Sequence, residues 1–217
     1  MKTYAVAILP VLLLLCGGPL FAAYPLGTDD AGTVRQNGFE LETFYEGFKD
    51  ISGEPDQNLG VSFKHGITSR FDIGFSLPCR MHPVAAERVG AASLGLKFSL
   101  VPDKLAFSVS NELGEKEYFL NGIYTKGFGG LRTHLNAGYL STGEETKKGK
   151  AFYGLAAEYP LAKYEAVAEL KGEEGGVGSF LLGLRYRLKE FLFISSGVSR
   201  ALEADNYRFT GGFHLEF

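Results

Sequence analysis

The chain has 217 residues, with 22 basic and 25 acidic side chains and a mean hydropathy close to zero. This length suits one domain, and the balanced charge argues against a nucleic-acid-binding protein, which would show a basic patch or a high pI. The lack of a long apolar run excludes a helical membrane protein. A β-barrel remains possible, because its strands show alternation rather than bulk hydrophobicity.

The first 23 residues have the order of a secretory signal peptide. Lys2 gives a short positive region, an almost wholly apolar run extends from Ala5 to Cys16, and small residues follow at Ala22 and Ala23. The apolar run is too short for the ~20 residues of a spanning helix. We therefore predict a signal peptide over residues 1–23, cleaved after Ala22 or Ala23.

The two cysteines bear on export. Cys16 opens the alternative of a lipoprotein signal, although Leu15 occupies a position where that signal has Gly, Ala or Ser. Removal of the signal would leave Cys79 as the single cysteine, so no disulfide could form within the mature chain. Loss of Lys2 lowers the basic count from 22 to 21 against 25 acidic residues, a net charge of about −4.

Residues 24–35 precede the first alternating segment and are predicted to form an N-terminal periplasmic segment. Their Thr28, Asp29 and Asp30 form a short polar motif. One hypothesis is that this motif folds into the periplasmic mouth of a barrel, where its carboxylates meet arginines of the lumen. An ordinary Asp-rich turn is the alternative.

Residues 36–217 carry twelve segments with period-two alternation, the pattern of strands with one apolar and one polar face. In the first, Phe39 and Leu41 alternate with Glu40 and Glu42. The segments near 117–125 and 191–199 are weaker. Tight and longer connections alternate along the chain, as in barrels with periplasmic turns and outer loops. The sequence thus predicts an all-β fold, a single transmembrane antiparallel barrel of about twelve strands.

The polar face should point inward, because lipid tolerates apolar side chains and disfavours charge. A soluble β-sandwich or a lipocalin-like barrel would have too little interior for so many apolar faces. The lumen charges would form a structural network of ion pairs, or set the selectivity of a narrow pore. The predicted lumen residues are Glu40, Glu42, Glu46, Lys64, Asp72, Lys97, Arg132, His134, Glu158, Glu165, Glu169, Lys171, Arg185, Arg187, Arg208 and Glu216.

The chain ends on an alternating strand whose apolar face carries Phe213, Leu215 and Phe217. A terminal Phe in this position resembles the signal that the outer-membrane barrel assembly machinery recognises. With the signal peptide, it predicts the bacterial outer membrane as location, and its lipid and the assembly machinery as partners.

Several blocks resemble a bacterial outer-membrane family labelled MetA-pathway of phenol degradation, or simply transporter. The blocks are Tyr24–Thr33, Phe39–Glu42, Gly66–Gly74, His134–Tyr139 and Ala168–Leu170. The resemblance implies a barrel that passes small molecules, aromatic or hydrophobic ones among them, across the outer membrane.

The sequence offers little for an enzyme or a cofactor. No Ser or Cys stands at persuasive spacing from a histidine, and one short loop supplies too few ligands for a soft metal ion. We therefore expect a channel without cofactor or metal; a non-conducting structural or surface-interaction barrel is the alternative, and an outer-membrane hydrolase the third. The residues weighed were His65, His82, His134, His214, Cys79 and Met81.

Overall fold

A computed structural model describes residues 24–49, 55–84, 88–144, 147–176, 178–202 and 207–217. The predicted signal peptide lies outside these residues. The described part of the chain has no helix long and apolar enough to cross a membrane. Its strands are β1 (Phe39–Lys49), β2 (Pro55–Thr68), β3 (Phe71–His82), β4 (Ser93–Val101), β5 (Leu105–Glu112), β6 (Tyr118–Phe128), β7 (Leu131–Ser141), β8 (Lys150–Leu161), β9 (Tyr164–Glu173), β10 (Ser179–Lys189), β11 (Leu192–Ala201) and β12 (Tyr207–Glu216).

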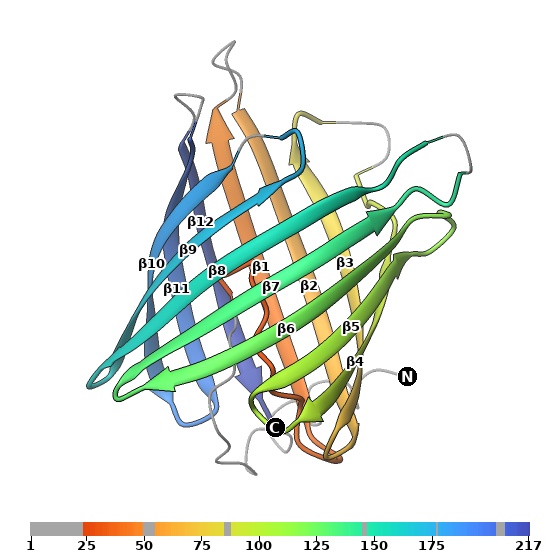
Figure 1. Ribbon diagram of the computed structural model, residues 1–217. Coiled ribbons are helices and arrows are strands. Elements are labelled where there is room, and N and C mark those ends of the chain that lie inside the picture. The colour runs from red at the N-terminus through yellow and green to blue at the C-terminus, as the bar shows by residue number, and fades with distance from the viewer. Residues whose placement is uncertain (1–23, 50–54, 85–87, 145–146, 177, 203–206) are drawn as a thin grey trace, which may run out of the picture.

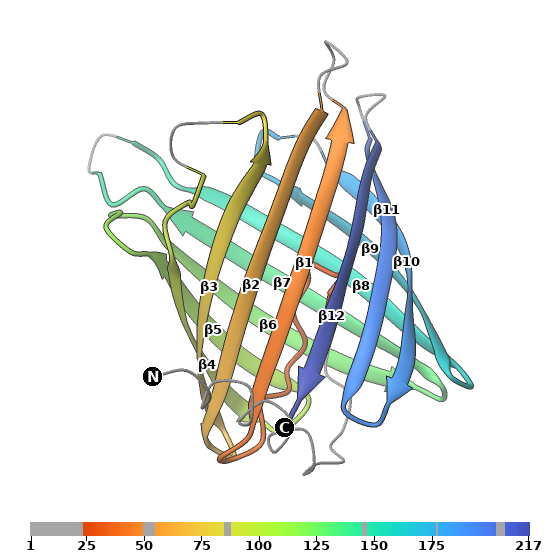
Figure 2. The same cartoon turned by 180° about the vertical axis from the view of Figure 1, so that it is seen from behind.

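The strands form one closed antiparallel barrel, which confirms the predicted fold class (Figures 1 and 2). Each strand pairs with its neighbour in sequence, and β12 returns to pair with β1. Phe39 and Phe217 exchange both backbone hydrogen bonds at this seam, at 2.6 and 2.9 Å, and their rings stack. Closure leaves no unpaired edge, as a strand-built protein in lipid requires.

The outward face is a continuous apolar belt. Leu155 in β8 lies opposite Leu135 in β7 and Leu170 in β9, and all three side chains are exposed. β6, whose phase the sequence left open, points Asn121 and Ile123 inward, where both are buried. An outward apolar surface around a polar interior is the arrangement of an outer-membrane barrel rather than a soluble one.

The connections follow the predicted alternation. At the short-turn end, β6 and β7 are joined by Gly129 and Gly130, and Gly129 has the positive φ of 63° that a two-residue hairpin needs. At the other end the strands extend further than expected, since β2 begins at Pro55 and β3 continues to His82. Polar residues pair there above the apolar belt, where alternation of hydrophobicity gives no signal.

A charge in the middle of the belt should be costly. Leu155→Arg is expected to lower the free energy of unfolding by about 2–4 kcal/mol, because it places a cation at mid-strand on the outer face. Leu188→Arg, beside Lys189 at the end of β10, is the matched control and should cost about 0–1 kcal/mol. Urea unfolding of both variants in lipid vesicles measures the difference; equal costs would contradict the outward placement of Leu155 in lipid.

Candidate functional site

The chain before β1 runs inside the barrel. Residues 24–34, called the lumen segment below, descend through the interior to the short-turn end before the chain turns up into β1 (Figures 1 and 2). Most of the segment is buried, and Asp30 and Ala31 have no exposed surface. The sequence analysis predicted this stretch at the periplasmic mouth of the barrel. In the structure it lies deeper, inside the lumen.

Tyr24 holds the upper end of the segment between strands β1 and β10. Its backbone N–H donates to Glu42 Oε1 at 3.0 Å, and its carbonyl accepts from Arg185 Nε at 3.1 Å. The ring stacks on Phe44, and the phenol donates to the Tyr45 carbonyl at 2.9 Å. Burial, reinforced by the nearby acidic side chains, raises the pKa of the Tyr24 phenol, which therefore remains a hydrogen-bond donor.

In the middle of the segment, the backbone forms its hydrogen bonds with side chains of the barrel wall. These side chains take the place of the backbone groups that a neighbouring strand would provide. The N–H groups of Gly27 and Thr28 both donate to Glu169 Oε1. Asp29 exchanges two hydrogen bonds with the Asn136 amide, its N–H donating at 2.9 Å and its carbonyl accepting at 2.7 Å. These side chains satisfy buried backbone groups that would otherwise destabilise the segment.

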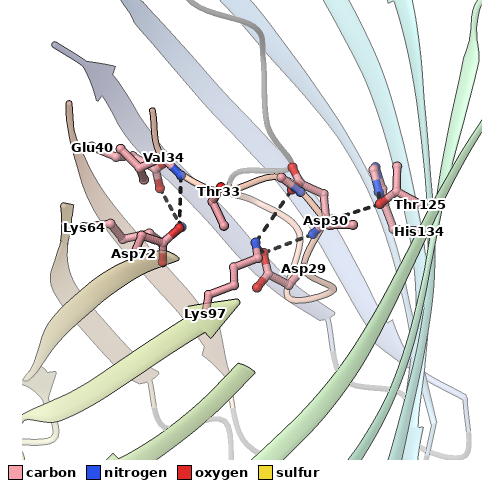
Figure 3. A network of polar contacts seen from close by, with 12 residues as sticks. Asp29, Asp30, Thr33, Val34, Glu40, Lys64, Asp72, Lys97, Thr125 and His134 are labelled. Atoms are coloured by element: carbon pink, nitrogen blue, oxygen red, sulfur yellow. Dashed lines mark hydrogen bonds and ion pairs between the residues drawn. The ribbon is translucent and has the colours of Figure 1, made fainter. Parts of the chain in front are cut away.

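The lower end is fixed in the same way, as Figure 3 shows. Ala31 N–H donates to Thr125 Oγ1 at 2.9 Å, and Val34 N–H donates to Asp72 Oδ2 at 3.0 Å. Asp30 accepts from Gly32 N–H at 2.6 Å within a tight local turn. The segment thus contacts β1, β3, β6, β7, β9 and β10.

The carboxylates of the motif meet a lysine. Lys97 Nζ lies 2.9 Å from Asp29 and 3.7 Å from Asp30, and its side chain is largely buried (Figure 3). The sequence hypothesis expected arginines; for Asp29 the cation is instead Lys97. Its position in β4 lets it reach across the lumen to the segment.

Apolar contacts also hold the segment against the barrel wall. Leu26 and Ala31 pack on two small apolar patches of the inner wall. Burial of such patches is favourable and needs no directional partner. The sequence analysis assigned no role to inward apolar residues. The two clusters are Leu26 with Ala156, Val167 and Leu181, and Ala31 with Ala106 and Ile123.

Glycines in the wall make room for the segment. A methyl group on Gly183 would lie 2.9 Å from Pro25 Cγ and 2.8 Å from the Ser196 carbonyl oxygen. A methyl group on Gly154 would lie 2.5 Å from Thr28 Oγ1. Atoms this close must move apart, so the wall and the segment fit only with small residues here.

Gly183→Ala is accordingly expected to loosen the segment and to raise ion conductance through the lumen. Residues 24–34 should become more sensitive to added protease in the folded barrel. Gly127→Ala is the control, because no atom lies within 4 Å of its added methyl group. Equal protease sensitivity of the two variants would contradict the proposed fit.

Arg185, which also donates to the Tyr24 carbonyl, is the centre of a buried ionic network. Its Nη1 lies 2.6 Å from Glu158 and 2.7 Å from Glu165, and the side chain is only 2% exposed. Arg132 and His134 approach Glu158 from the other side, at 3.7 and 3.3 Å. Such a network cross-links β7, β8, β9 and β10.

A second cluster, called the seam cluster below, lies at the β1–β12 closure. Lys64 pairs with Glu40 at 2.5 Å, and His214 lies between Glu42 and Glu216, 3.0 Å from each. Ligand atoms of Glu40, Glu42 and His214 lie within 4.8 Å of one another. The Lys64 ammonium already provides Glu40 with a cation, so the geometry suits an ion-pair network within the protein.

The predicted lumen residues all lie on the inward face, at different depths. The structure also buries polar side chains that the predicted set lacked, chiefly Asn121, Thr125 and Asn136, whose only sequence signal is their parity. Phe213 of the predicted assembly signal faces outward. Buried are Glu40, Asp72, Lys97, His134, Glu158, Glu169 and Arg185; half-buried are Glu42, Glu46, Lys64, Arg132, Glu165 and Glu216; exposed to the lumen or its mouths are Lys171, Arg187 and Arg208.

One arrangement has the order of a catalytic relay. Thr125 Oγ1 lies 2.9 Å from His134 Nδ1, and His134 Nε2 lies 3.3 Å from Glu158. The three side chains are buried, and Thr125 Oγ1 accepts the Ala31 N–H. A substrate could not reach this hydroxyl without displacing the lumen segment, so the contacts support packing rather than acyl transfer.

Cavities lie beside the lumen segment in the interior of the barrel. One, of about 260 Å³, is lined by Phe119 and Phe152 together with Gly27 and Thr28 of the segment. Another, of about 320 Å³, extends over the segment toward Lys97 and the seam cluster. These are volumes for small molecules, and both end on the lumen segment.

Closure, the outward apolar belt and the polar lumen define the class: an outer-membrane β-barrel. Solved structures of this class are similar. KdgM porin matches with a TM-score of 0.61 at 12% identity, covering 82% of this chain and 99% of its own. An outer-membrane channel from Pseudomonas putida F1 matches with a TM-score of 0.61 at 13% identity, covering 90% and 100%.

A third similar structure is an enzyme, outer membrane phospholipase A from Escherichia coli. Its TM-score is 0.52 at 11% identity, covering 89% of this chain and 93% of its own. At such identities the likeness shows the fold alone. No family model and no curated protein matches the sequence.

Proposed function

We propose that this protein is an outer-membrane channel for small molecules, with the lumen segment as its constriction. The observation that carries the proposal is that two cavities in the lumen are lined in part by residues 24–29 of the lumen segment. Charges of both signs line the interior and would form a fixed electrostatic barrier to ions.

The cargo that we propose is small and aromatic or hydrophobic. Phe119 and Phe152 both point into the lumen, and their rings meet edge to face with centroids 5.6 Å apart in the cavity lining. Aromatic rings favour another ring in offset or edge-on contact. The sequence resemblance to the phenol-degradation transporters points to the same class of cargo.

The alternative is a non-conducting barrel whose outer loops act in surface interactions. The observation in its favour is that hydrogen bonds, ion pairs and apolar contacts hold the lumen segment along its length. A plug held this firmly could close the lumen.

Single-channel recording separates the two functions. The mature chain, refolded in detergent and inserted into a planar bilayer, should give steady conductance that phenol reduces from the side carrying the aromatic cavity. Phe119→Ala should weaken the phenol block while the open-channel current persists. A folded barrel that never conducts would overturn the channel proposal and support the interaction barrel.

Two partners belong to the same proposal. The outward belt would lie in outer-membrane lipid, and the closing strand β12 would present Phe213, Leu215 and Phe217 to the assembly machinery. The support is its position, since β12 forms the seam that closes the barrel.

A further inference from the structure

The backbone nitrogen of Tyr24 lies in an acidic site. It is 3.0 Å from Glu42 Oε1, while the Tyr24 carbonyl is held from the other side by Arg185. The Tyr24 ring and hydroxyl are fixed on Phe44 and Tyr45. Tyr24 is therefore positioned by four separate contacts, with its nitrogen directed at a carboxylate.

The seam cluster beside this nitrogen has one more carboxylate than it has cations, while Arg185 on the other side is paired with Glu158 and Glu165. Among its described residues, the seam cluster has three carboxylates, Glu40, Glu42 and Glu216, with Lys64 and His214 as their cationic partners. Lys64 is 2.5 Å from Glu40 but 3.9 Å from Glu42. Glu42 Oε1 already has His214 at 3.0 Å, but the three carboxylates of the cluster outnumber its two cations, so a further cation beside Glu42 would balance the charge.

We propose that the mature chain begins at Tyr24, and that Glu42 is the binding site for its terminal ammonium group. Signal-peptide cleavage adds water across the Ala23–Tyr24 peptide bond, leaving a carboxylate on Ala23 and an ammonium on Tyr24. A neutral N–H that donates one hydrogen bond to Glu42 becomes a cation at the same position. Processing would thereby complete the ion-pair network that holds the lumen segment.

This assignment decides between the two cleavage sites that the sequence allowed. Cleavage after Ala22 would place the new ammonium on Ala23, one residue and about 3.8 Å of chain away from the atom that Glu42 contacts. The charge would then lie outside this hydrogen bond. The inference depends on the proposed export of the chain and is independent of whether the barrel conducts.

The mass of the mature protein is the first test. The chain with its native leader is expressed, recovered from outer membranes and measured intact by mass spectrometry. We expect the mass of residues 24–217. A mass greater by one alanine, or a retained leader, would overturn the assignment.

Reactivity of the terminal amine is the second test. At about pH 7 an amine-selective acylating reagent should label Tyr24 of the folded wild-type barrel about tenfold more slowly than in Glu42→Gln, because each unit of raised pKa removes nine-tenths of the free amine. Glu42→Gln keeps the shape of the side chain, so slow labelling of both variants would indicate burial alone and overturn the ion pair.

Two controls accompany the labelling. Glu173→Gln makes the same substitution at an exposed pair with Lys150 near the long-loop rim, and should label like the wild type. A chain with one extra alanine before Tyr24 keeps Glu42 intact, and serves if Glu42→Gln does not fold. Its amine should label as fast as that of Glu42→Gln; wild-type speed would contradict the proposal.

Discussion

A chain that lacks residues 24–34 is expected to conduct several-fold more ion current than the full mature chain. The deletion removes the backbone that crosses the lumen, together with Leu26 and the Asp29 carboxylate that pairs with Lys97. Conductance rises with the cross-section of the narrowest part, and the proposed function makes the lumen segment that part. Single-channel recording in planar bilayers measures the change.

The deletion variant must first be shown to fold, because it leaves Glu169 and Asp72 without their backbone partners. Heat-modifiable migration on a gel is the check. Asp29→Asn serves as a milder variant, since it removes one charge from the Lys97 pair and keeps the shape. An unchanged current in a folded deletion variant would show that the constriction lies elsewhere, for instance in the ionic network around Arg185.

The largest stability loss from a single substitution is expected for Arg185→Gln. Arg185 pairs with two carboxylates and donates to the Tyr24 carbonyl, and it is almost fully buried. Removing one partner of a buried ion pair costs about 3–5 kcal/mol, because the remaining charge is left uncompensated. Urea unfolding in lipid vesicles, followed by tyrosine fluorescence, measures the loss.

Arg200→Gln is the matched control for this substitution. Arg200 lies near the long-loop end of β11 with its guanidinium over the Tyr207 ring, and its side chain is exposed. Exposed charges contribute about 0–1 kcal/mol. If both variants lost stability equally, the buried network around Arg185 would not be what cross-links the barrel.

The barrel fold could be predicted from the sequence because the same period-two alternation of apolar and polar residues recurs in strand after strand. In β8, Tyr153 and Leu155 face out while Gly154 and Ala156 face in, and each further strand adds independent support. The boundaries at the long-loop end were less accessible, since polar residues above the belt pair without apolar alternation. β6 lacked a clear phase because inward Ile123 interrupts its polar face.

The path of the lumen segment could not be predicted, for a physical reason. Its backbone hydrogen bonds go to side chains such as Glu169, Asn136 and Asp72, which are far away in sequence and have no common spacing. Locally, Gly27 and Asp30 favour a turn. The indirect sign was on the wall, where Val167 and Leu181 place apolar side chains in a polar lumen.

The position of the lumen segment also orders the events of assembly. A row of strands has no interior until its first and last members join, and here that join is between β1 and β12. The segment precedes β1, yet its partners extend to β10, and Tyr24 lies against Gly212 of β12. The lumen segment can therefore complete its contacts only when β1 and β12 have paired and the cylinder is closed around it.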